Sequence, residues 1–117
     1  MTLQIANRLI GTDHPPFLIA EMSGNHNQSL DQALAIVEAA ASSGAHALKL
    51  QTYTPDTITL DVRSGDFNIS DPSSIWHGQN LHDLYTKAYT PGEWHKPIID
   101  EASDLGLICF SSPFDET

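Results

Sequence analysis

The chain is poor in positive charge. Its 117 residues include 5 Lys and Arg against 15 Asp and Glu, so the formal net charge is −10 at pH 7. Nucleic-acid surfaces and contacts with anionic lipid need clustered Lys and Arg. The composition therefore argues against a nucleic-acid or membrane partner. A small anionic substrate stays possible, because a single site can be positive on an acidic protein.

Cysteine and long apolar runs are also scarce. Cys109 is the single cysteine, so no disulfide can form within the chain. No apolar run approaches the ~20 residues of a membrane span. Residues 1–6 lack the basic start and the long apolar stretch of a secretion signal. We therefore predict a cytoplasmic protein, and the hydrophobic fraction of 40% is enough to build a core.

The apolar runs predict buried strands, and three- and four-residue spacing between them predicts helices. The first ten residues indicate a strand pair or hairpin that turns near Ala6 and Asn7. The expected strands are 17–20, 45–50 and 107–110. The expected helices are 30–41, capped by Ser29 and ended by Gly44; a short one at 80–88; and one that starts at Thr90-Pro91 with Glu93 and ends at Gly106.

Strands that alternate with helices predict an α/β fold with a parallel sheet. Three parallel strands with an open edge make a poor independent domain, and the chain ends where another helix is due. We therefore expect residues 1–16 to form an N-terminal hairpin. Residues 17–117 would be a partial domain of roughly three βα units, the truncated N-terminal part of a (β/α)8 TIM barrel.

Each predicted strand ends in polar side chains, namely Glu21, then Lys49 with Gln51, then Ser111 with Ser112. Ligands of such folds bind at the carboxyl ends of the strands, so we expect these groups to share one rim.

Each of these groups also has a structural interpretation. Glu21 is either a catalytic acid or base or a carboxylate held by a salt bridge. Lys49 either binds phosphate or carboxylate, forms a Schiff base, or is a solvated lysine. Ser112 either donates to an anion or belongs to an ordinary turn.

His26 is flanked by Asn25 and Asn27 and could bind a polar substrate or a metal. No second histidine follows at short helical spacing, so a metal site within this segment has little support. We expect His77, His82 and His95 to be surface or loop residues.

Three stretches together resemble the sialic acid synthase family, whose members condense phosphoenolpyruvate with an amino sugar. They are IAEMSGNHNQS at 19–29, GAHALKLQTYTPDT at 44–57 and FSSPFDET at 110–117. Within the family, KLQTYTPDTITLD and WHGQNLHDLYTKAYTP are closer to the pseudaminic acid synthase branch than to the N-acetylneuraminate branch.

The resemblance implies a (β/α)8 barrel followed by a small antifreeze-like domain. It implies condensation of phosphoenolpyruvate with a 2,4-diacetamido-trideoxy hexose to give a nonulosonic acid and phosphate. A divalent metal, usually manganese, would be held by histidines of later strands, and the full-length protein would be a homodimer. The implied roles are water or proton transfer for Glu21, phosphoenolpyruvate binding for Lys49 and Ser112, sugar binding for Gln51, and shaping of the rim for Asn25 and His26.

Two alternatives remain open at this point. One is an N-acetylneuraminate synthase that uses N-acetylmannosamine, and the other is an aldolase that forms a Schiff base through Lys49. We expect the segment by itself to be inactive.

Overall fold

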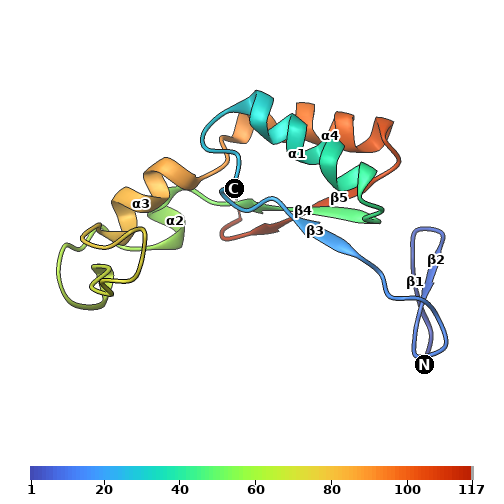
Figure 1. Cartoon of the computed structure of the whole chain (residues 1–117), viewed down its shortest axis with the longest axis horizontal. Helices are drawn as coiled ribbons and strands as arrows, with labels where there is room; N and C mark the ends of the chain where they lie inside the picture. The colour runs from blue at the N-terminus through green and yellow to red at the C-terminus, as the bar shows by residue number, and fades with distance from the viewer. Residues whose placement is uncertain (117) are drawn as a thin grey trace.

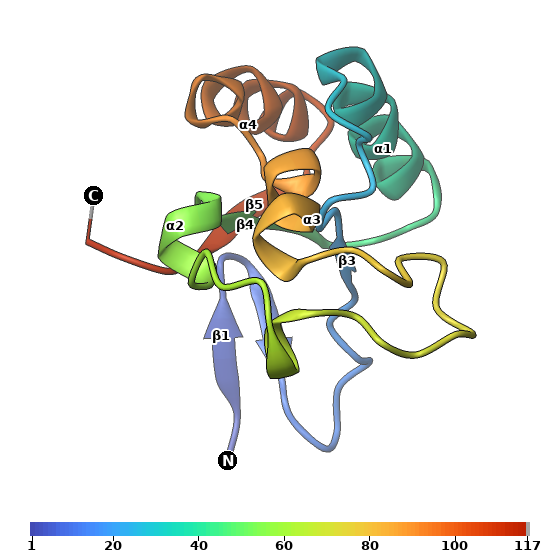
Figure 2. The same cartoon turned by 90° about the vertical axis from the view of Figure 1, so that its left-hand side faces the viewer.

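A three-stranded parallel sheet forms the centre of the molecule and is covered on one face by two helices (Figure 1). The structure is a computed structural model that describes residues 1–116. It measures 48 × 33 × 31 Å along its principal axes. A hairpin lies beyond one end of the sheet, and two short helices with a long connection lie beyond the other (Figures 1 and 2).

The sheet has the order β3-β4-β5, with β3 at Ile19–Glu21, β4 at Ala47–Thr52 and β5 at Ile108–Pro113. Both pairings are parallel, which confirms the predicted α/β fold. Each strand runs further toward its carboxyl end than its apolar run predicts, because the polar residues continue the backbone ladder. The register aligns Glu21 with Lys49, and Gln51 with Ser112.

Side chains of the central strand alternate between two environments. Leu48 and Leu50 are fully buried under α1 (Leu30–Ser42) and α4 (His95–Asp104), while Lys49 and Gln51 lie on the opposite face. Burial of the apolar face holds the helices on the sheet. The residues that make this core are Met22, Ala33, Val37, Ala40, Leu48, Leu50, Ile98, Ala102 and Leu107.

Helix α1 begins as the sequence predicts. The Ser29 hydroxyl accepts a hydrogen bond from the Gln32 amide at 3.2 Å, which satisfies one of the free N–H groups of the first turn. The helix ends before Gly44, whose φ of +89° suits a residue without a side chain.

The predicted start of the last helix at Thr90 is wrong. A 3-10 turn, η2 (Gly92–Trp94), comes first, and α4 begins only at His95. The Thr90 hydroxyl does not cap this helix, because it is hydrogen-bonded to Nε2 of His26 at 2.9 Å.

The N-terminal hairpin is present as predicted. Strands β1 (Leu3–Ile5) and β2 (Arg8–Ile10) pair antiparallel, and Ala6 in the turn has a φ of +50°.

The connection from β4 to α4 contains α2 (Pro55–Ile58), the 3-10 turn η1 (Gly65–Phe67) and α3 (Leu81–Ala88). Arg63 pairs with both carboxylate oxygens of Asp83, at 2.8 and 3.0 Å, which ties the outer part of this connection to α3. Among residues 1–116, no helix has the length and apolarity that crossing a bilayer requires.

Replacing Ile98 by alanine tests the core. Ile98 is fully buried, whereas its neighbour Ile99 on the same helix is 44% exposed. We expect Ile98→Ala to lower the free energy of unfolding by about 2–5 kcal/mol, through lost burial and a cavity. Ile99→Ala, the matched control, should cost about 1 kcal/mol or less. Urea unfolding followed by circular dichroism measures both, and equal losses would contradict the assigned core.

Candidate active site

Four polar side chains predicted to share a rim lie on one face of the sheet, which we call the helix-free face. Glu21, Lys49 and Gln51 alternate with the buried residues of β3 and β4, and Ser112 is the register partner of Gln51 on β5. Neighbouring strands lie about 4.8 Å apart, and residues two apart on a strand lie about 6.6 Å apart. The four side chains therefore start from an area about the size of a small phosphorylated acid.

Glu21 and Lys49 form an ion pair across the strands. Oε1 of Glu21 lies 2.9 Å from Nζ of Lys49, and the side chains are 50% and 26% exposed. A pair this accessible contributes about 1 kcal/mol or less, so an arriving anion can compete for the lysine. Glu21 is therefore held by a salt bridge in the free chain, as one of the two interpretations predicts. This salt bridge does not exclude a catalytic role for Glu21.

Gln51 and Ser112 are available to a ligand. Within residues 1–116, neither side chain has a hydrogen-bond partner, although the two residues are aligned on neighbouring strands. An amide and a hydroxyl without partners, close to a single lysine, can donate and accept hydrogen bonds. Lys49 is the only Lys or Arg in the three parallel strands.

The other end of the helix-free face is apolar. A cavity of about 240 Å³ is lined by Ile5, Phe17, Ile19, Ile108 and Phe110, so the hairpin contributes Ile5 to it. The polar groups are therefore confined to the carboxyl ends of the strands.

Asn25 does not lie with these four residues. Its Nδ2 donates to the carbonyl of Met22 at 2.9 Å, so the side chain stabilises the turn that follows β3. Neighbouring residues of this loop, Ser23, Asn27 and Gln28, have positive φ values between 48° and 56°.

His26 also differs from the expectation that it shapes the rim. The residue is fully buried and lies edge-on to the ring of Trp94, 5.2 Å between ring centroids. The Gln28 amide donates to its Nδ1 at 3.1 Å, so Nε2 carries the proton and donates to Thr90. Burial lowers the pKa of His26, which keeps the ring neutral.

The loop after β3 is held against the segment before η2 at three points. His26 bonds to Thr90, the Gln28 side-chain amide donates to the carbonyl of Tyr89, and Gly24 packs on Ala88. A side chain at position 24 would place its Cβ 2.9 Å from the Ala88 oxygen, so only glycine allows this approach. Residues 24–28, in which the sequence suggested substrate binding, therefore hold two loops together at the carboxyl end of the sheet.

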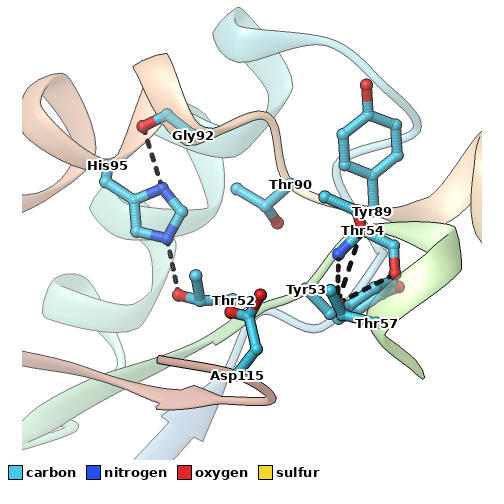
Figure 3. Close-up of a pocket in the computed structure, with 9 residues that line it drawn as sticks. All are labelled: Thr52, Tyr53, Thr54, Thr57, Tyr89, Thr90, Gly92, His95 and Asp115. Carbon is cyan, nitrogen blue, oxygen red and sulfur yellow. Dashed lines mark hydrogen bonds between the residues drawn. The ribbon is translucent and has the colours of Figure 1, made fainter. Parts of the chain in front are cut away.

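A second, hydroxyl-lined pocket opens beyond the end of β4 (Figure 3). Its volume is about 190 Å³, and Thr52, Tyr53 and His95 are among its lining residues. Burial and the nearby Tyr85 raise the pKa of the Tyr53 phenol.

One group that sequence reasoning missed lies at this pocket. Nε2 of His95 is 2.7 Å from Oγ1 of Thr52, which is 2.6 Å from Oγ of Ser111. We expected His95 to be a surface or loop residue, but its ring is half-buried at the first turn of α4. The sequence feature that could have pointed to this hydrogen-bonded group was Thr52, the last residue of the KLQT stretch that begins at Lys49.

Within residues 1–116, no group of three His, Cys, Asp or Glu side chains could hold a metal ion. The expectation that metal ligands come from later strands stays a prediction.

His26 makes the stability of the chain depend on pH. The unfolded chain takes up a proton at this residue near pH 6.5, whereas the folded chain resists protonation to lower pH. The free energy of unfolding should therefore fall as pH drops below about 6.5, by at most about 1.4 kcal/mol per unit, and should gain nothing from this group above that pH.

Unfolding in urea between pH 7.5 and 5.5 measures this effect. We expect His26→Gln to be less stable at pH 7.5 but to lose less stability on acidification than the unaltered chain. His77→Gln, at an exposed histidine, is the control and should keep the original slope. An unchanged slope in His26→Gln would contradict the assignment.

Known proteins resemble this chain along most of its length. It is 46% identical over 112 residues to a pseudaminic acid synthase of Campylobacter jejuni, covering 96% of this chain and 32% of the relative. A pseudaminic acid synthase of Helicobacter pylori is 46% identical over 100 residues, covering 86% and 29%. The chain thus spans about a third of the length of the curated relatives that it matches.

A solved structure shares the fold. The crystal structure of the Bacillus subtilis spore coat polysaccharide biosynthesis protein SpsE superimposes with a TM-score of 0.63 at 33% identity, over 95% of this chain and 27% of that one. Residues 36–117 match the NeuB family. This match, together with the two synthases, confirms the family resemblance seen in the sequence, and the chain belongs to the NeuB family.

Proposed function

We propose that the full-length protein condenses phosphoenolpyruvate with a 2,4-diacetamido-trideoxy hexose to give a nonulosonic acid and phosphate. The observation that carries this proposal is the grouping of Glu21, Lys49, Gln51 and Ser112 on the helix-free face. The identity to two pseudaminic acid synthases supports this choice of sugar.

Lys49 and Ser112 would bind phosphoenolpyruvate. The phosphate and carboxylate need a fixed cation and short donors, and Lys49 is the cation of the three strands. Ser112 offers a hydroxyl without a partner in the described residues, one strand away. When the anion binds, it competes with Glu21 for Nζ of Lys49, which frees the carboxylate next to the bound substrate.

Glu21 would then serve the proton transfers. Carbon 3 of the enol attacks the sugar aldehyde, whose oxygen takes up a proton and becomes a hydroxyl, while carbon 2 becomes an oxocarbenium that a water molecule captures. The tetrahedral carbon 2 then breaks its bond to the phosphate oxygen, which releases inorganic phosphate and leaves the ketone. A carboxylate beside this centre can orient the water and accept its proton. Gln51, aligned with Ser112, would hold hydroxyl groups of the sugar.

We further propose that β3, β4 and β5 are the first strands of an eight-stranded barrel. In a barrel the helix-free face becomes the interior, and its carboxyl end becomes the catalytic rim. We also propose that the full-length protein is a cytoplasmic homodimer. It would use a divalent metal, which we propose to be manganese. Residues 1–116 contain no group of three His, Cys, Asp or Glu side chains that could hold this metal.

The Schiff-base alternative is disfavoured by the ion pair. A Schiff-base lysine must present a free Nζ to the substrate carbonyl, whereas Nζ of Lys49 is paired with Oε1 of Glu21 at 2.9 Å. Phosphate release from phosphoenolpyruvate, measured with each sugar in turn, tests the proposal. It should be fastest with the diacetamido hexose and slower with N-acetylmannosamine. No release with either sugar would refute the proposed function.

Removing the charge of Lys49 tests the anion site. In the full-length protein, we expect Lys49→Met to lower kcat/KM for phosphoenolpyruvate at least about 100-fold, equivalent to ~2.7 kcal/mol. Lys96→Met is the matched control, because Lys96 is exposed and pairs with Asp100 on α4. Its kcat/KM should stay within about twofold of the unaltered protein. Equal activity of both variants would contradict the assigned role of Lys49.

Replacing Glu21 by glutamine separates catalysis from simple charge pairing. The amide keeps the shape of the side chain but cannot accept a proton, so kcat should fall about 10²- to 10⁴-fold. The KM for phosphoenolpyruvate should not rise, because Lys49 loses a competing anion. Glu38→Gln, at an exposed glutamate of α1, should have no effect. A full kcat in Glu21→Gln would show that Glu21 only pairs with Lys49.

A further inference from the structure

A chain of hydrogen bonds lies behind the helix-free face, at the carboxyl ends of β4 and β5. Oγ of Ser111 is 2.6 Å from Oγ1 of Thr52, which is 2.7 Å from Nε2 of His95. Nδ1 of His95 is 3.1 Å from the carbonyl oxygen of Gly92 (Figure 3). The chain thus joins two strands to the first residue of α4.

The direction of these bonds follows from the chemistry of the groups. A carbonyl oxygen only accepts, so Nδ1 of His95 carries the proton and Nε2 of the neutral ring is an acceptor. Thr52 must then donate to Nε2, and its oxygen accepts from the hydroxyl of Ser111. Each hydroxyl has one proton, so every donor in the chain is committed to one partner.

The two hydroxyl residues are next to the proposed binding residues in the sequence. Thr52 follows Gln51, and Ser111 precedes Ser112, so their side chains lie on the opposite face of the same strand ends. Beyond this pair, the Phe114 amide donates to the carbonyl of Thr52 at 3.1 Å, close to the point where β4 and β5 end. Strand ends fray where the ladder stops, so a side-chain tie at this point limits the movement of Gln51 and Ser112.

We infer that Ser111, Thr52 and His95 are positioning residues, which hold Gln51 and Ser112 at the spacing that the substrates require. This inference rests on the proposed function, because it assigns those two residues to the substrates. Thr52 and Ser111 act through their neighbours and need no contact with a substrate. Loss of the tie should therefore weaken binding of both substrates more than it slows the chemical step.

The test compares variants of Thr52 in the full-length protein. Thr52→Val keeps the shape and the strand preference but removes the hydroxyl, whereas Thr52→Ser keeps the hydroxyl. Thr86→Val is the control, because its hydroxyl donates to the carbonyl of His82 on its own helix and, within residues 1–116, to no other group. The readouts are the KM for each substrate, kcat, the urea midpoint, and the ¹⁵N signal of His95 Nε2.

We expect Thr52→Val to raise both KM values about 3- to 10-fold with kcat within about twofold, and Thr52→Ser to restore them. The ¹⁵N signal of Nε2 should move downfield in Thr52→Val alone, because the acceptor loses its donor. Ser111→Ala should also raise KM, and Ser111→Ala combined with Thr52→Val should be no worse than Thr52→Val, because both remove the same bond.

Several results would overturn the inference. They are unchanged KM values in Thr52→Val, equal defects in Thr52→Val and Thr52→Ser, additive effects of Thr52 and Ser111, or an unmoved Nε2 signal. An unaltered protein that releases no phosphate would instead refute the proposed function, and the Nε2 signal would still show whether the tie exists.

Discussion

The structure depends on the alternation of side chains along β4. Leu48 and Leu50 are buried under the helices, and Lys49 and Gln51 lie on the other face. A slip of one residue in the register would place the lysine and the amide in the core and expose the two leucines. Burying an unpaired ammonium is costly, so the core itself fixes which side chains reach the helix-free face. Stability and the geometry of the site therefore have one cause.

The loops at the carboxyl end are organised by buried polar contacts rather than by apolar packing alone. His26 joins the loop after β3 to Thr90, and His95 joins α4 to Thr52. The two rings use opposite tautomers, because an amide donates to Nδ1 of His26 and a carbonyl accepts from Nδ1 of His95. Each histidine thus fixes a loop or helix start relative to the strands.

The sequence was sufficient for the elements and for the residues of the helix-free face. Apolar runs and caps predicted the three strands and α1, since these depend on local periodicity and on Ser29 and Gly44. The polar strand ends predicted a shared rim, and the register confirms it for Glu21, Lys49, Gln51 and Ser112. The same rule was wrong for Ser111, because it precedes Ser112 on the strand and lies on the opposite face.

Sequence reasoning was wrong about the start of α4 and missed the roles of His26 and His95. Both histidines bond to partners 43 or more residues away, and no local pattern reports such contacts. A histidine beside asparagines is equally typical of a binding loop and of a buried tie between loops.

The most direct test of the central claim is a crystal structure of the full-length protein with bound phosphoenolpyruvate. We expect oxygen atoms of the ligand about 2.7–3.2 Å from Nζ of Lys49 and Oγ of Ser112, on the helix-free face. The Glu21–Lys49 pair, 2.9 Å in the free chain, should lengthen. Phosphoenolpyruvate bound elsewhere, with this pair intact, would contradict the account.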